Sequence, residues 1–319
     1  MTFRALRVKM GTVMSRQNAA GPKRFLFAPF FFLVLVSCAP RGGRETAPAG
    51  RPLIVVSMLP QGWFVSRVAG ERARLLVLAG PGQNPHDWEP SPRQIAELSG
   101  AAAWILAGVE FEITLRPKIA ALYPRLAIID GVEGVRWRTL EEHEGDEHPD
   151  GGAEPDADGR DRHSWLGEEP AKIMARAIRD ALSAADADYR EQYAANCGAA
   201  IAEITAEFER LRETLRPLRG STVFVYHPAF GYFLDEFGIA QAAVETGGKE
   251  PTPRLLAALV ERARRERPRA IFVQAQYPVE AAETVARAVG ARIVRLDPLA
   301  ADWLDNIRVM GAALRETAP

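Results

Sequence analysis

The sequence contains very little cysteine: its 319 residues include only two, Cys38 and Cys197. Cys38 follows an apolar run near the N-terminus, in a region that looks like a targeting segment. If the thiol of Cys38 is modified when that segment is processed, an exported protein has one remaining free thiol and no internal disulfide. Cys197 falls on an apolar helical stripe, and we expect it to be a packed core thiol.

The chain lacks net positive charge outside its first residues. The formal net charge is −1, and residues 1–37 contain six basic and no acidic residues, so the rest of the chain carries −7. An acidic body lacks the clustered positive field that binds phosphates, which argues against nucleic acid as a partner. Hydrophobic residues make up 47% and charged residues 25%, as in ordinary globular proteins. The length fits two domains of about 100–200 residues each.

The apolar run 25–36 is shorter than the about 20 residues that span a bilayer. A basic pair precedes the run, and this combination is typical of a signal peptide. The run ends in Leu35-Val36-Ser37-Cys38, which resembles the bacterial lipobox, where the cysteine becomes the lipid-modified first residue. We therefore expect a signal peptide at 1–37 and a lipidated tether at 38–51. Such a protein would be a membrane-anchored lipoprotein outside the cytoplasm, in the periplasm or at the cell surface.

Short apolar segments alternate with helical segments after residue 52. This alternation predicts parallel β-α units and an α/β fold with two similar β/α lobes, residues 52–186 and 218–319. The helix after the first strand is expected at 63–69. The predicted strands are 53–59, 74–79, 102–107, 126–130, 222–226, 239–244, 270–274 and 292–296.

A long helix is predicted between the lobes, at residues 187–217. Apolar side chains recur there at spacings of three and four, and no Gly or Pro interrupts the pattern between Ala199 and Arg216. At a rise of 1.5 Å, about 30 residues extend roughly 45 Å, enough to cross from one lobe to the other. We expect a rigid linking helix and small lobe motion. A coiled-coil dimer is the alternative, but the stripe is short for one, so we expect a monomer.

The segment 141–161 contains ten acidic residues and two histidines, His143 and His148, but no large apolar side chain. It is expected to be a mobile acidic loop, because it has nothing to bury in a core. The two histidines among carboxylates would bind divalent cations weakly. A solvated acidic insertion without such a role is an equal alternative.

The other three of the five histidines lie at the ends of predicted elements. His86 lies in the loop after strand 74–79, His163 follows the acidic segment, and His227 follows strand 222–226. Asp297 follows the last strand in the same way. Taken singly, each is explained as a solvated or hydrogen-bonded residue, or as a helix cap. If the strand carboxyl ends of both lobes face a common cleft, all four side chains converge there.

Three imidazoles and one carboxylate form a ligand set that suits a borderline divalent cation, above all Zn²⁺. Four protein ligands fill a tetrahedral site, which is typical of holding a metal and not of activating a bound water. A secreted zinc hydrolase is the competing class, but the sequence has no His-Glu-x-x-His motif. Because neutral imidazoles bind the ion, affinity should fall as the histidines protonate below about pH 6.

Four motifs then point to a known family. They are Pro85-His86-Asp87-Trp88-Glu89-Pro90, Arg162-His163-Ser164-Trp165-Leu166, Tyr226-His227-Pro228-Ala229-Phe230-Gly231-Tyr232-Phe233 and Leu296-Asp297-Pro298-Leu299. In this order they resemble the motifs of the metal-binding solute-binding lipoproteins of bacterial zinc/manganese ABC transporters, the cluster A-I or cluster 9 family. The resemblance covers about residues 53–316.

This resemblance implies a non-enzymatic transport protein that carries a metal between two lobes and delivers it to a membrane permease. The ligands that it implies are His86, His163, His227 and Asp297. Family members that prefer manganese usually carry Glu at the position of His227, so the resemblance favours zinc, with manganese as the alternative. A metal-stabilised surface adhesin is another alternative. Arg162 departs from the family pattern, which has Pro before the second ligand.

Overall fold

The computed structural model describes residues 50–86, 88–139, 159–245, 252–277 and 279–317. These residues belong to one compact unit, 49–319. The expected signal peptide and tether up to residue 49, with Cys38, lie outside the described residues, as does most of the acidic segment with its two histidines. Within the described ranges, no helix is both long enough and apolar enough to cross a membrane.

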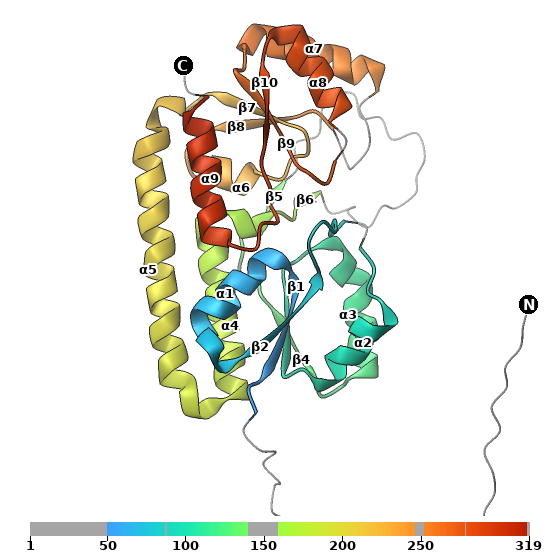
Figure 1. Cartoon of the computed structure of the whole chain (residues 1–319), viewed down its shortest axis with the longest axis vertical. Helices are drawn as coiled ribbons and strands as arrows, with labels where there is room; N and C mark the ends of the chain where they lie inside the picture. The colour runs from blue at the N-terminus through green and yellow to red at the C-terminus, as the bar shows by residue number, and fades with distance from the viewer. Residues whose placement is uncertain (1–49, 87, 140–158, 246–251, 278, 318–319) are drawn as a thin grey trace, which may run out of the picture. The chain divides into compact units, whose positions relative to one another are not determined.

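The first half of the unit is built on a four-stranded parallel sheet with the order β2-β1-β3-β4. The central strands β1 and β3 consist almost entirely of buried residues, as in parallel sheets covered by helices. Figure 1 shows this sheet beside α1 and α3. The strands are β1 (Leu53–Met58), β2 (Arg74–Ala79), β3 (Ala103–Leu106) and β4 (Ala127–Asp130).

The second half repeats this topology. Its parallel sheet has the order β10-β9-β7-β8, so in both halves the second strand lies on one side of the first and the third and fourth on the other. The predicted pair of similar β/α halves is therefore confirmed. The strands are β7 (Thr222–Val225), β8 (Ala240–Ala243), β9 (Ala270–Val273) and β10 (Arg292–Arg295).

Helices follow the strands in both halves. One prediction was wrong: the first helix begins at Leu59 instead of 63, because Pro60 fits the first helical turn although the apolar residues before it look like strand. Helix α2 begins at Pro92, with Ser91 as N-cap accepting the Gln94 N–H. The helices are α1 (Leu59–Ala69), α2 (Pro92–Glu97), α3 (Glu110–Leu122), α4 (Glu168–Ala185), α6 (Gly231–Asp235), α7 (Pro253–Glu266), α8 (Glu280–Val289) and α9 (Trp303–Arg315).

The long helix α5 (Arg190–Leu215) runs along both halves (Figure 1). A short 3₁₀ turn precedes it, η4 (Ala187–Tyr189), and another follows it, η5 (Arg216–Leu218). It packs against α1 and α4 of the first half and α9 of the second. Its stripe is buried as predicted, with Phe208 0% exposed. The Cys197 thiol is buried and donates to the Ala175 carbonyl, 3.5 Å away. The boundaries that we assign to lobes and linker stay a prediction.

A small antiparallel hairpin, not predicted from the sequence, joins the residues on either side of the acidic segment. Strand β5 (Arg138–Thr139) pairs with β6 (Arg160–Asp161), one strand on each side of the acidic segment. Two-residue strands carry no periodicity that a sequence could show. The pairing matters because it places Asp161, and with it His163, against the second half of the unit.

Candidate metal centre

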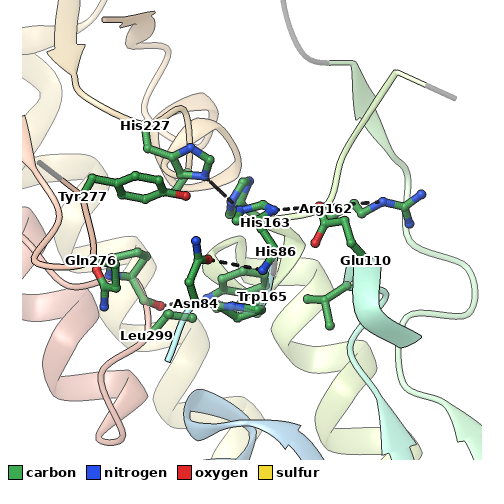
Figure 2. A pocket seen from close by; sticks show the side chains of 14 residues that line it. Asn84, His86, Glu110, Arg162, His163, Trp165, His227, Gln276, Tyr277 and Leu299 are labelled. Carbon is green, nitrogen blue, oxygen red and sulfur yellow. Dashed lines mark hydrogen bonds and ion pairs between the residues drawn. The ribbon is translucent and has the colours of Figure 1, made fainter. Parts of the chain in front are cut away.

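Three histidines from different elements meet at the carboxyl ends of the two sheets. His86 lies in the loop after β2, His163 lies between β6 and the turn η3 (Ser164–Leu166), and His227 lies two residues after β7. The Nε2 atom of His227 is 3.1 Å from Nε2 of His86 and 3.0 Å from Nε2 of His163. All three can present one ligand atom within 4.8 Å of the others. Figure 2 shows the rings turned toward one another.

This spacing can be compared with zinc geometry. With Zn–N bonds of about 2.0–2.1 Å, two nitrogens of a tetrahedral site lie about 3.3–3.4 Å apart. Two of the nitrogen pairs here are within about 0.4 Å of that separation. The predicted convergence of His86, His163 and His227 is therefore present in the fold.

The opposite ring nitrogen of each histidine faces a carboxylate. His86 Nδ1 lies 3.1 Å from Glu110 Oε1, His163 Nδ1 lies 2.9 Å from Asp161 Oδ1, and His227 Nδ1 contacts Glu245 Oε1. An ionised carboxylate only accepts hydrogen bonds, so each Nδ1 carries the proton. The three Nε2 lone pairs then face one another, and a shared cation relieves their repulsion. Carboxylate partners of this kind orient metal-binding histidines and increase their basicity.

Burial keeps His227 in the form that binds metals. His163 is 5% and His227 6% exposed, whereas the side chain of His86 is 30% exposed. The pKa of His227 is lowered well below its ordinary 6.5. Burial is the main cause, and positive charge on His163 and on His86 lowers the pKa further. The His227 imidazole is therefore neutral at neutral pH, with a lone pair available on Nε2.

Two of the supporting carboxylates stay ionised despite their burial. Burial raises the pKa of Asp161, but the hydrogen bond and charge of His163 together with Arg138 outweigh it, so the pKa is lowered. Burial also raises the pKa of Glu110, but the hydrogen bond and charge of His86 outweigh this effect, so the pKa of Glu110 is lowered as well. The loop just before Glu110 is held by Glu112, whose side chain accepts the N–H groups of Ala107, Gly108 and Val109 at 2.7, 2.7 and 3.1 Å.

Asp297, the fourth predicted ligand, is not part of this group among the described residues. It follows β10, and its Oδ1 accepts hydrogen bonds from Gln276 Nε2 at 3.1 Å and from the Leu299 N–H at 2.9 Å. Its neighbours Pro298 and Leu299 line the same pocket as the three histidines. The structure thus brings three of the four predicted ligands together, and Asp297 as a ligand stays a prediction.

His227 is also held by residues that follow β9. The side chain of Gln274 donates to the His227 carbonyl at 2.8 Å and accepts its N–H at 3.3 Å. The ring of Tyr277 stacks on the His227 imidazole with centroids 4.6 Å apart and an angle of 22°. Together with Glu245, these contacts restrain the backbone, the ring plane and the tautomer of one histidine.

The three supporting carboxylates, Glu110, Asp161 and Glu245, were not predicted from the sequence. Each lies near the end of an element: Glu110 begins α3 after β3, Glu245 follows β8, and Asp161 ends β6 two residues before His163. Applying the strand-end rule to acids as well as to histidines would have identified Glu110 and Glu245 as candidates. In an acidic chain, that rule also selects many irrelevant residues.

A family model described as "zinc-uptake complex component A periplasmic" (ZnuA) matches residues 54–317. The "zinc-binding lipoprotein AdcA" of Streptococcus pneumoniae is 27% identical over 86% of this chain, which spans only about half of that relative's length (54%).

Two solved structures are similar over 84% of this chain with a TM-score of 0.75 each. One is a crystal structure of ZnuA, 31% identical and covered over 99% of its length. The other is a ZnuA deletion mutant with zinc bound, 30% identical and covered over 98% of its length. The family consists of metal-binding transport proteins and not of enzymes. The chain belongs to this ZnuA family, the periplasmic metal-binding components of ABC transporters.

Proposed function

We propose that this protein captures Zn²⁺ outside the cytoplasm and delivers it to the membrane permease of an ABC transporter. The observation that carries the proposal is the set of three Nε2 atoms, each on a histidine whose Nδ1 faces a carboxylate. Imidazole nitrogens suit Zn²⁺, whereas Mn²⁺ suits oxygen ligands. A site that presents three nitrogens therefore favours zinc over the manganese alternative.

We propose Asp297 as the fourth ligand. Structural zinc sites are four-coordinate, and the three histidines leave one position to fill. Asp297 follows a strand whose carboxyl end faces this pocket, and the next two residues line it. A complete set of protein ligands would hold the ion as cargo, with no open position for a reactive water.

The anchor and the partners also belong to the proposal. We propose that Cys38 carries the lipid, that residues 38–51 form the tether, and that the protein acts as a monomer. The support is the lipobox-like sequence before Cys38 and the name of the AdcA relative, a zinc-binding lipoprotein. A Cys38→Ala variant should move from the membrane fraction to the soluble extracytoplasmic fraction, and retention on membranes would contradict lipid anchoring.

Single alanine variants of the three histidines test the site. His86→Ala, His163→Ala and His227→Ala should each weaken zinc affinity by about 100-fold or more, because a lost ligand exceeds the 10–100-fold effect of losing an outer partner. His148→Ala, a histidine of the acidic segment, is the matched control and should change affinity little. Calorimetry with metal-free protein provides the affinities. Unchanged affinity in the three site variants would refute the ligand assignment.

A further inference from the structure

Arg138 connects a candidate metal ligand to the opposite half of the protein. Its Nη1 donates to Asp161 Oδ2 at 2.6 Å, while its Nε donates to Asp235 Oδ2 at 2.6 Å. Asp161 precedes His163 in the first half, and Asp235 ends α6 in the second. One guanidinium therefore joins two carboxylates that belong to different halves of the unit.

Asp161 is shared between Arg138 and His163. Its Oδ1 accepts from both Nδ1 and the backbone N–H of His163, at 2.9 and 3.0 Å, and its Oδ2 faces Arg138. The Asp161 side chain is 0% exposed, so no water replaces a lost partner without rearrangement. A carboxylate with one oxygen on each partner transmits a displacement of Arg138 directly to the His163 ring.

A second contact reinforces the connection. The Arg138 N–H donates to the Tyr232 hydroxyl at 2.9 Å, and that hydroxyl donates to the Asp161 carbonyl at 3.1 Å. The neighbouring Gly231 leaves the necessary space, because a Cβ there would lie 1.9 Å from Arg138 Nη1. Helix α6 is thus closely fitted to the hairpin β5–β6 at this point.

We infer that Arg138 is a positioning residue, which couples the orientation of His163, and hence metal affinity, to the contact between hairpin β5–β6 and helix α6. The inference rests on the proposed metal site but goes beyond it, because Arg138 lies outside the ligands and their carboxylate partners. When the halves are in contact, Arg138 holds Asp161, and Asp161 holds the His163 ring with Nε2 toward the metal. Loosening the contact frees the ring and weakens the site.

The chain offers a matched control in Arg212. It also bridges two acids across the halves, contacting Glu168 of α4 and lying 2.8 Å from Glu236 Oε2 just after α6. Neither Glu168 nor Glu236 contacts a site histidine through any bond identified in the described residues. Arg138→Gln and Arg212→Gln therefore both remove a cation that bridges the halves. Only Arg138→Gln is expected to change metal binding.

The test compares zinc affinity, the thermal midpoint of the metal-free form, and the visible absorption of the Co²⁺-loaded form, which reports ligand geometry. Arg138→Gln should weaken zinc binding by about 10-fold, the lower end for outer partners, and change the Co²⁺ spectrum. Arg138→Lys should restore part of the affinity. Arg212→Gln should lower only the thermal midpoint.

Asp235→Asn provides a second variant in case Arg138→Gln does not fold. Asp235 is 56% exposed on its side chain, and its replacement leaves Arg138 bound to Asp161. It should weaken zinc binding in the same direction but less than Arg138→Gln. If the Arg138 and Asp235 variants bind zinc as tightly as the unmodified protein and have its Co²⁺ spectrum, this inference alone is overturned. Absence of zinc binding by the unmodified protein would overturn the proposed function as well.

Discussion

The Nε2 atoms of His163 and His227 lie 3.0 Å apart although the residues are 64 positions apart in sequence. They belong to different halves, and each ring is oriented by its own buried acid, Asp161 or Glu245. Two independently oriented rings meet at this distance only if the halves are placed accurately against each other. The contact of the halves is therefore part of the binding site.

The acid behind His227 offers a first prediction. Glu245→Gln should weaken zinc binding by about 10–100-fold, because a neutral amide supports the imidazole less than a carboxylate does. Glu207→Gln is the matched control, since Glu207 is also buried but pairs with Arg210 and Arg308 away from the site. Competitive titration with a chromophoric chelator measures both variants. Equal affinities in the two variants would show that the Glu245 carboxylate does not tune the ligand.

Asp297 can be tested without disturbing its hydrogen bonds. Asp297→Asn keeps an oxygen that accepts the Leu299 N–H but removes the negative charge. If Asp297 is the fourth ligand, zinc affinity should fall by about 10-fold or more, since a neutral amide is a poorer zinc ligand than a carboxylate. Asp302→Asn, at the N-cap of α9, serves as control because Asn caps helices equally well. Unchanged affinity in Asp297→Asn would assign the fourth position to another group.

The low pKa of His227 predicts how the metal-free protein responds to acid. The native state keeps His227 neutral, whereas the unfolded chain protonates it below about pH 6.5. The unfolded state therefore binds more protons, and the free energy of unfolding should fall as pH drops from about 6.5 toward the native pKa. Urea unfolding between pH 7.5 and 5.5 measures this fall, and His227→Gln should make it smaller. An equal fall in both proteins would contradict the assigned shift.

The same shift modifies the expectation that zinc affinity declines below about pH 6. His227 competes for protons only at lower pH than an ordinary histidine, because burial and then its two histidine neighbours lower its pKa. As the pH is lowered, the first loss of zinc affinity should therefore not come from protonation of His227.

The packing of α5 gives a stability prediction separate from the metal. Phe208 is 0% exposed and lies against Phe233, Phe237 and Trp303. Phe208→Ala should reduce the free energy of unfolding by about 3–5 kcal/mol through lost burial and a cavity. Val309→Ala, where the side chain is 50% exposed, should change it by no more than about 0.5 kcal/mol. Urea unfolding distinguishes the two, and a similar small effect in both would show that the core relaxes around Phe208.

Much of the fold follows from local patterns in the sequence. The alternation of short apolar strands and helices predicts two parallel sheets, and the three-four spacing around Cys197 and Phe208 predicts the long helix. His86 and His227 could be grouped because each follows a strand whose carboxyl end was expected to face a common cleft, whereas His163 follows the acidic segment. The order of elements is clear in the sequence, but the facing of the two lobes had to be assumed.

The supporting residues could not be found in the same way. The hairpin that positions Asp161 pairs residues on either side of the acidic segment, and two residues per strand leave no periodic signal. The pairing of Glu110 with His86 depends on the turn at the start of α3, held by Glu112. Such contacts arise from tertiary placement, so acids that orient the site are indistinguishable in sequence from solvated ones.

The measurement that tests the central claim most directly is a titration of the metal-free protein with Zn²⁺, with Mn²⁺ as competitor. The three oriented imidazoles predict one tightly held zinc per chain, which excess manganese does not displace. Saturation should also raise the free energy of unfolding, by about 4 kcal/mol at a free zinc concentration 1,000 times Kd. Tight manganese with weak zinc would contradict the assigned metal, and the absence of any stoichiometric metal at neutral pH would contradict the site itself.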